Sequence, residues 1–215
     1  MSAILLDLDG VLIDSWRQVE QSLLAAAEEI GFDCMAGLPG FRARMGMPLE
    51  TIVAELGWPV QIVERFRRAA RLRDRHVRPF EGVPAMLVCL RAFGLRIGVV
   101  TGKDRPRTLA ILQTAGLARL VDSVITADDA PGKPRPDGLW ECERRLGAGS
   151  ALAYIGDTAV DVAAAENAGR LPVLATWGGG PRLPSRAELI ELADPAEAVA
   201  LVADLVRPPI RRAGR

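Results

Sequence analysis

The sequence predicts an α/β protein built on a parallel sheet with helices on both faces, and a segment of helices only inserted near its N-terminus. Short apolar runs recur along the chain without polar alternation, as expected of strands that are covered on both faces. Segments with helical periodicity separate these runs, and this alternation favours a parallel sheet with right-handed crossovers. Residues 15–79 interrupt the rhythm, because they contain helical segments without an intervening strand.

Each predicted element has a recognisable boundary. The expected strands are Ala3 to Leu8, Leu95 to Val100, Ser123 to Ile125, Leu152 to Ile155 and Pro172 to Ala175. The expected helices between them are Val83 to Phe93, Arg105 to Ala115, Asp137 to Leu146 and Thr158 to Ala168. Pro106 lies near one helix start, and Gly94, Gly116 and Gly169 follow helix ends. Inserted helices are expected over Trp16 to Ile30, Leu49 to Leu56 and Val60 to Val77, and the tail from Pro208 is expected to fray. We therefore expect a core domain of residues 1–14 and 80–215, and an inserted helical domain of residues 15–79.

Composition excludes several classes of function. The 215 residues include 27 basic and 27 acidic side chains, so no net charge favours nucleic acid or an anionic membrane. The N-terminus lacks the basic and apolar regions of a signal peptide, and three widely spaced cysteines fit a reduced, cytoplasmic compartment. His76 is the only histidine, which excludes histidine-dependent triads and multi-histidine metal sites. A metal ion here would be held by oxygen, which favours Mg²⁺.

The first chemical motif is Leu6-Asp7-Leu8-Asp9-Gly10, at the end of the first expected strand. Two acids two residues apart on an extended chain point the same way, and burying both is costly unless a cation compensates them. One acid could then attack phosphorus while the other transfers protons. The alternative interpretation is a strand end followed by a polar turn.

Three further motifs also follow predicted strands, at the edge where open α/β sheets bind ligands. Thr101-Gly102 offers a hydroxyl and backbone N–H groups to an anion, although Thr-Gly is also common in turns. Lys133, in a loop stiffened by prolines, offers a fixed positive charge, or belongs to an exposed loop. Asp157 and Asp161 lie one helical turn apart and suit a metal ligand with a supporting acid, while Asp157 could instead be only an N-cap.

Together, and in this order, the four motifs resemble the signature of the haloacid dehalogenase superfamily. The match covers Ala3 to Ser15 and Phe80 to about Ala175, and the inserted helices match that family's C1 cap in position and size. The resemblance implies a Rossmann-like, doubly wound parallel sheet with an inserted helical cap. The nearest likeness is to the phosphoglycolate phosphatase-like branch.

By this resemblance, the chain is a phosphoric monoester hydrolase that uses Mg²⁺. Asp7 attacks the phosphoryl group to form an aspartyl-phosphate, and Asp9 transfers protons as the catalytic acid and base. Thr101, Gly102 and Lys133 bind the phosphoryl oxygens. The implied metal ligands are Asp7, Asp9 through its backbone carbonyl, Asp157 and Asp161, the last of which either orients the metal shell or orients Lys133.

Comparisons within the family favour a phosphate ester as substrate. Dehalogenases of the superfamily lack the second acid, which is present here as Asp9. Leu49 replaces the cap lysine of phosphonoacetaldehyde hydrolases, and Val19 replaces the cap histidine of β-phosphoglucomutase-type mutases. A mutase or dehalogenase, or a non-catalytic regulator that binds a phosphorylated ligand or a protein, stays the alternative.

Substrate choice is expected to lie in the inserted helices. Arg42 and Arg44 could bind a carboxylate or hydroxyls of the leaving group, or belong to a solvated basic turn. The expected partner is a small phosphorylated metabolite, with no nucleic acid or membrane, and the expected state is a monomer or homodimer.

Overall fold

The computed structural model describes residues 2–184, 186 and 188–206, so the predicted frayed tail lies outside the described residues. Within them, six strands form one parallel sheet in the order β5-β4-β1-β6-β7-β8. Their bounds are β1 Ala3–Leu6, β4 Arg96–Val100, β5 Ser123–Ile125, β6 Ala153–Gly156, β7 Leu171–Ala175 and β8 Ile190–Leu192. Counted along the chain, this is the strand order 3-2-1-4-5-6 of the doubly wound Rossmann fold. The predicted fold class is confirmed.

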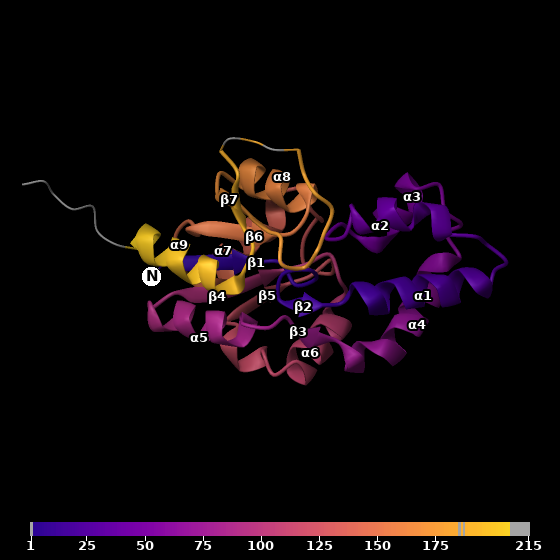
Figure 1. Ribbon diagram of the computed structural model, residues 1–215, viewed down its shortest axis with the longest axis horizontal. Coiled ribbons are helices and arrows are strands. Elements are labelled where there is room, and N and C mark those ends of the chain that lie inside the picture. Colours follow the sequence, from indigo (N-terminus) through magenta and orange to yellow (C-terminus); the bar gives the residue numbers. More distant parts are fainter. Residues whose placement is uncertain (1, 185, 187, 207–215) are drawn as a thin grey trace, which may run out of the picture.

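Helices cover both faces of the sheet (Figure 1). One face packs against α5 (Val83–Ala92), α6 (Arg105–Thr114) and α9 (Pro195–Val206), and the other against α7 (Asp137–Leu146) and α8 (Ala159–Ala168). Alternate residues of β1 serve the two faces: Ile4 and Leu6 join the first cluster, Ala3 and Leu5 the second. Burial on both sides explains why β1 reads as a continuous apolar run.

Residues 15–79 form a group of helices beside the sheet, with a hydrophobic cluster of their own (Figure 1). The helices are α1 Trp16–Glu28, α2 Leu38–Arg42, α3 Leu49–Glu55 and α4 Ile62–Arg73. Two short antiparallel strands, β2 Ile13–Asp14 and β3 Arg78–Pro79, pair where the chain enters and leaves this group. We call residues 15–79 the helical insertion. The domain boundaries themselves stay a prediction.

Several elements differ from the sequence-based expectation. The expected helix from Val60 to Val77 is divided into α4 and a 3-10 turn, Asp74–His76. A further 3-10 turn, Met35–Gly37, leads into α2, and neither element is among the predicted helices. Strand β8 and helix α9 complete the C-terminal edge of the sheet; β8 has only three residues, with Glu191 exposed at its centre, so its periodicity is too short to detect.

A buried ion pair joins the helical insertion to α6. Arg107 donates from Nε and Nη2 to the two carboxylate oxygens of Asp74, at 2.8 and 2.9 Å. The Arg107 guanidinium also lies 5.6 Å from the centre of the Phe66 ring, in α4. Such a two-pronged pair fixes the orientation of both groups. It therefore holds the returning end of the insertion against the helix that follows β4.

We expect Asp74→Ala to lower the free energy of unfolding by about 3 kcal/mol, because it leaves the Arg107 charge buried without its main partner. Chemical denaturation at neutral pH measures this loss. Arg68→Ala, which removes an exposed ion pair with Glu29, is the matched control and is expected to cost less than about 1 kcal/mol. Equal losses of unfolding free energy in the two variants would show that the buried Asp74–Arg107 pair stabilises the protein no more than an exposed ion pair does.

Candidate active site

The sheet brings two of the predicted acids together at its switch point. Asp7 follows β1 and Asp157 follows β6, and these strands are neighbours, with Asp7 N donating to Ile155 O at 2.8 Å. Gly10 turns the chain at a φ of +80°, and a Cβ there would lie 2.0 Å from Asp157 Oδ2. Only glycine therefore fits both the backbone conformation and the space beside Asp157.

Lys133 lies at the centre of the acids. Its Nζ donates to Asp7 Oδ1 at 2.6 Å, to Asp161 Oδ1 at 2.6 Å and to the Tyr154 hydroxyl at 2.8 Å. Burial opposes the ammonium charge, but Asp161 and Asp7 raise the pKa of Lys133 above its ordinary value. Lys133 thus carries a fixed positive charge at the point where β1 ends.

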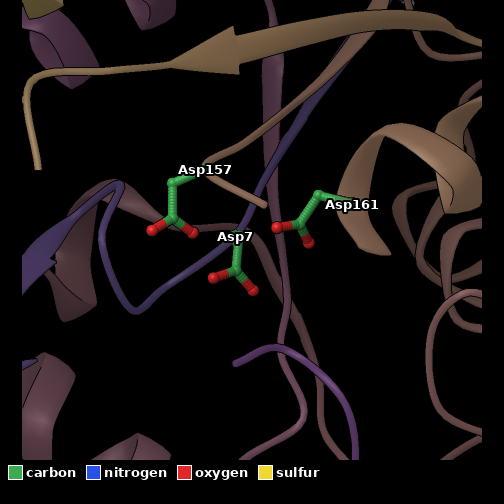
Figure 2. Close-up of side chains that lie close together, drawn as sticks. All are labelled: Asp7, Asp157 and Asp161. Carbon is green, nitrogen blue, oxygen red and sulfur yellow. The ribbon is translucent and has the colours of Figure 1, made fainter. Parts of the chain in front are cut away.

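Asp7, from the end of β1, meets Asp157, which follows β6, and Asp161, in the first turn of α8 (Figure 2), and each offers an oxygen within 4.8 Å of the others. Burial raises the pKa of Asp7 to about 7, although the charge of Lys133 opposes the shift. Burial, together with the charges of Asp161 and Asp7, raises the pKa of Asp157 well above its ordinary value. Within the described residues, Asp157 Oδ1 is buried without a hydrogen-bond partner. A cation at this point would satisfy the orphaned oxygen and the excess of negative charge, so the residues fit a divalent metal ion.

Asp161 differs from the other two acids, because both of its oxygens are engaged by the protein. Its Oδ1 accepts from Lys133, and its Oδ2 accepts from Thr158 N at 3.1 Å and Thr158 Oγ at 2.6 Å, which completes a capping box at the start of α8. This arrangement orients Lys133 directly. A direct bond from Asp161 to metal stays a prediction.

Asp9 has a different environment from Asp7. Ser15 Oγ donates to Asp9 Oδ1 at 2.5 Å, and Lys103 Nζ lies 3.2 Å from the same oxygen. Burial acts to raise the pKa of Asp9, but the charge of Lys103 and the Ser15 hydrogen bond hold it below its ordinary value. The two neighbouring acids are therefore driven apart in pKa, which is typical of acids with different chemical roles.

The sequence alone predicts no role for Ser15 or Lys103. Both residues lie just beyond the motifs quoted above, six residues after Asp9 and two residues after Thr101. Their contact with Asp9 depends on how the chain turns after β1 and β4, and residue spacing does not contain that information.

The helical insertion closes directly over the site. A Cβ on Gly102 would lie 2.4 Å from Gly46 O and 2.5 Å from Met47 O. A Cβ on Gly46, whose φ is +100°, would lie 3.0 Å from Lys133 Nζ. The predicted phosphate-binding residue Gly102 therefore also has a steric role, since it lets the insertion approach the ends of the strands.

A cavity lies between the insertion and the ends of the strands, and the centres of water molecules can occupy about 80 Å³ of it. Asp9, Thr101 and Lys103 form part of its polar wall, and the insertion contributes apolar side chains such as Phe41 and Phe66. A small cavity with a few polar groups in an apolar wall suits a small ligand.

Arg42 and Arg44 do not line this cavity. Arg42 Nη2 donates to Gly178 O at 3.2 Å, and its guanidinium lies 4.9 Å from the centre of the Trp16 ring. Arg44 is paired with Glu55 at 2.9 Å and donates to Gly40 O. Arg42 thus joins the insertion to the loop after β7, and the predicted substrate contacts of both arginines stay predictions.

The fold and the acids at its switch point define a hydrolase of the haloacid dehalogenase type. The model of the haloacid dehalogenase-like hydrolase family matches residues 4–174, and the chain belongs to this family. A phosphoglycolate phosphatase of Cupriavidus necator is 32% identical over 213 residues, which cover 92% of this chain and 91% of the relative. The "Probable phosphatase IndB" of Dickeya dadantii is 30% identical and covers 81% of each chain.

Solved structures agree on the fold. A hydrolase from Pseudomonas syringae superposes with a TM-score of 0.79 at 21% identity, covering 95% of this chain and 99% of the other. Both the predicted family, in its phosphoglycolate phosphatase-like branch, and the predicted enzyme class, a phosphoric monoester hydrolase, are confirmed by these matches. None of the helices among the described residues is long and apolar enough to cross a membrane.

Proposed function

We propose that this chain is a Mg²⁺-dependent phosphatase that hydrolyses a small phosphorylated metabolite through an aspartyl-phosphate on Asp7. The observation that carries the proposal is the meeting of Asp7, Lys133 and the unpartnered Asp157 carboxylate at the switch point, with Asp9 facing the adjoining cavity. Phosphoryl transfer depends mostly on positioning and on neutralising charge, and these groups supply both.

Asp7 and Asp157, together with the backbone carbonyl of Asp9, are the residues that would hold Mg²⁺. When bound, the ion supplies positive charge that neutralises the buried acids and the oxygens of the phosphoryl group. Nucleophilic attack, proton transfer and binding of the phosphoryl oxygens are all carried out by side chains of the protein.

The reaction needs two displacements at phosphorus. In the first, a carboxylate oxygen of Asp7 forms a bond to phosphorus while the ester P–O bond breaks. Asp9, after it has taken up a proton from solvent, gives that proton to the departing oxygen. In the second, water attacks phosphorus with Asp9 accepting its proton, the bond to Asp7 breaks and inorganic phosphate leaves. Lys133 and the Thr101 hydroxyl hold the phosphoryl oxygens in both steps.

The proposed substrate class is a phosphomonoester of the size of phosphoglycolate. The phosphatases among the relatives support this class, and so does the limited cavity between the insertion and the sheet. We further propose that closure of the insertion excludes water and places the leaving group in contact with the apolar residues of the insertion. A cytoplasmic location and a monomer or homodimer stay predictions.

Turnover of p-nitrophenyl phosphate, with and without Mg²⁺ after treatment with a chelator, tests the proposed function. We expect hydrolysis that is lost on chelation and restored by Mg²⁺. A folded protein that hydrolyses neither this ester nor a panel of phosphorylated metabolites would support the non-catalytic regulator instead.

We expect Asp157→Ala to weaken Mg²⁺ binding at least tenfold, with excess Mg²⁺ partly restoring activity. Calorimetric titration measures the affinity, and Arg135→Ala on an exposed ion pair is the control. Unchanged affinity in the Asp157 variant would remove this acid from the metal site.

Mg²⁺ binding should also depend on pH. The folded-state pKa of Asp7, about 7, lies above its ordinary value of 3.8, so ionising this acid costs the metal-free protein stability as pH rises through that interval. Mg²⁺ competes with the bound proton, so its affinity should rise with pH up to about 7 and then level off. The gain in Tm on adding Mg²⁺ should accordingly be larger at pH 8 than at pH 5.5. A gain that is equal at the two pH values would contradict the raised pKa.

A further inference from the structure

The loop that follows β7 lies against both segments that carry the candidate metal ligands. We call residues 176–180, which end in three consecutive glycines, the glycine loop. A Cβ on Gly178 would lie 2.4 Å from Gly10 O. A Cβ on Gly180 would lie 3.2 Å from both the backbone oxygen and the Oδ2 of Asp157. The backbone of the glycine loop therefore forms one wall of the candidate metal site.

The first two residues of the glycine loop are fixed to the sheet and to the turn after β1. Thr176 donates to Leu192 O through its N–H and its hydroxyl, at 2.8 and 3.0 Å. Trp177 Nε1 donates to Val11 O at 3.0 Å. The three glycines that follow have no side chains to hold them, and glycine has more backbone freedom than any other residue. Apart from a turn within the loop, their position beside Asp157 depends on contacts from other parts of the chain.

Arg42 supplies such a contact from the helical insertion. Its Nη2 donates to Gly178 O at 3.2 Å and would lie 3.9 Å from a Cβ on Gly179. The ring of Trp16, at the start of α1, lies 4.9 Å from the same guanidinium and helps to orient it. A side chain that contacts both the insertion and the loop can transmit the position of one to the other.

We propose that Arg42 is a positioning residue for the metal site and acts through the glycine loop. With the insertion over the sheet, Arg42 holds the loop against Asp157 and Gly10, and an ion at Asp157 is retained behind it. Closure of the insertion and Mg²⁺ binding are then coupled, and each favours the other by the same factor. This inference rests on the proposed Mg²⁺ site, and it gives Arg42 a role other than the predicted contact with substrate.

The direction of the expected effect separates positioning from simple electrostatics. Arg42 carries a positive charge, so its removal would by charge alone strengthen the binding of a cation. Loss of a residue that supports the wall of a metal site has the opposite effect. We therefore expect Arg42→Met to weaken Mg²⁺ binding about tenfold, measured by calorimetric titration of the intact chain without substrate. Arg42→Lys, which keeps a charged donor for Gly178 O, should restore most of the affinity.

Arg44→Met is the matched control. Arg44 lies two residues further along the insertion and carries the same charge, but its contacts with Glu55 and Gly40 O stay within the insertion. It should leave the Mg²⁺ affinity unchanged within about twofold. The Tm of the metal-free protein, measured for both variants, reports any general damage to the fold. A loss of Mg²⁺ affinity in Arg42→Met without a matching fall in this Tm is the result expected of a positioning residue.

A double-mutant cycle tests whether Arg42 acts through the glycine loop. Gly180→Ala places a Cβ 3.2 Å from Asp157 Oδ2, so it displaces the loop at the metal site without changing Arg42. We expect this substitution alone to weaken Mg²⁺ binding, and Arg42→Met to add little in its presence. Arg42→Gln takes the place of the methionine variant if that variant fails to fold.

The outcomes distinguish this inference from the proposed function. Unchanged or tighter Mg²⁺ binding in Arg42→Met would overturn the inference, and so would fully additive effects of the two substitutions. Equal losses of affinity in Arg42→Met and Arg44→Met would also overturn it, since they would show a general effect of the insertion. In each of these cases the unmodified protein still binds Mg²⁺, and the proposed function stands. An unmodified protein that neither binds Mg²⁺ nor depends on it for turnover would overturn both.

Discussion

Asp7→Asn is expected to reduce turnover at least 10³-fold while the fold is kept. The amide occupies the space of the carboxylate but is a poor nucleophile toward phosphorus, so no aspartyl-phosphate forms. Asp7 is buried at the end of β1 and accepts a hydrogen bond from Lys133, and Asn can preserve that contact through its own carbonyl oxygen. Steady-state kinetics, with circular dichroism as a check of folding, measures the effect.

Labelling provides an independent measurement for the same variant. Beryllium fluoride, an acyl-phosphate mimic, should bind the unmodified protein in stoichiometric amount with Mg²⁺ present and should fail to bind Asp7→Asn. Asp14→Asn is a suitable control, since this exposed acid belongs to the same segment and makes none of the described site contacts. Substantial activity in well-folded Asp7→Asn protein would exclude the covalent mechanism.

The sequence predicted most of the sheet and the acids that meet in the candidate site, because Asp7 and Asp157 directly follow buried strands and Asp161 lies one helical turn after Asp157. Asp7 and Asp157 are 150 residues apart in the chain, and the Rossmann strand order is enough to bring them together. The apolar runs could be recognised as strands because strands that are covered on both faces show no polar alternation. Strand β8 was not readable, because it is short and has an exposed acid at its centre.

The contacts between the insertion and the sheet could not be predicted in this way. The approach of Gly46 and Met47 to Gly102, and the pairing of Asp74 with Arg107, depend on how two groups of elements pack together. No periodicity in the sequence reports that packing. Lys103 illustrates the difference. The strand end predicts the position of the preceding motif, Thr101-Gly102, while the contact of Lys103 with Asp9 is seen only in the structure.

Lys133 holds the site together electrostatically, and Lys133→Ala is expected to have large effects on both stability and activity. The ammonium lies 2.6 Å from oxygens of Asp7 and of Asp161, so its removal leaves buried acids without their main counter-charge. We expect the metal-free variant to lose about 3–5 kcal/mol of unfolding free energy at pH 8, measured by chemical denaturation. Turnover should fall at least 10³-fold even with saturating Mg²⁺, because the phosphoryl oxygens also lose their fixed positive charge.

The pH dependence of this loss identifies its cause. In the unmodified protein the pKa of Asp7 is already raised to about 7 by burial, and losing Lys133 removes the charge that opposes that rise. The pKa of Asp7 in the variant therefore lies above 7, and the stability deficit should shrink as pH falls from 8 toward 7 and then change little through this acid. Mg²⁺ should also reduce the deficit, since it supplies positive charge to the same acids.

The control is Arg135→Ala, two residues further along the same loop, which removes an exposed ion pair with Asp137. It should change neither stability nor turnover appreciably. A deficit in Lys133→Ala that is independent of both pH and Mg²⁺ would mean that the lysine acts through packing of its side chain and not through its charge.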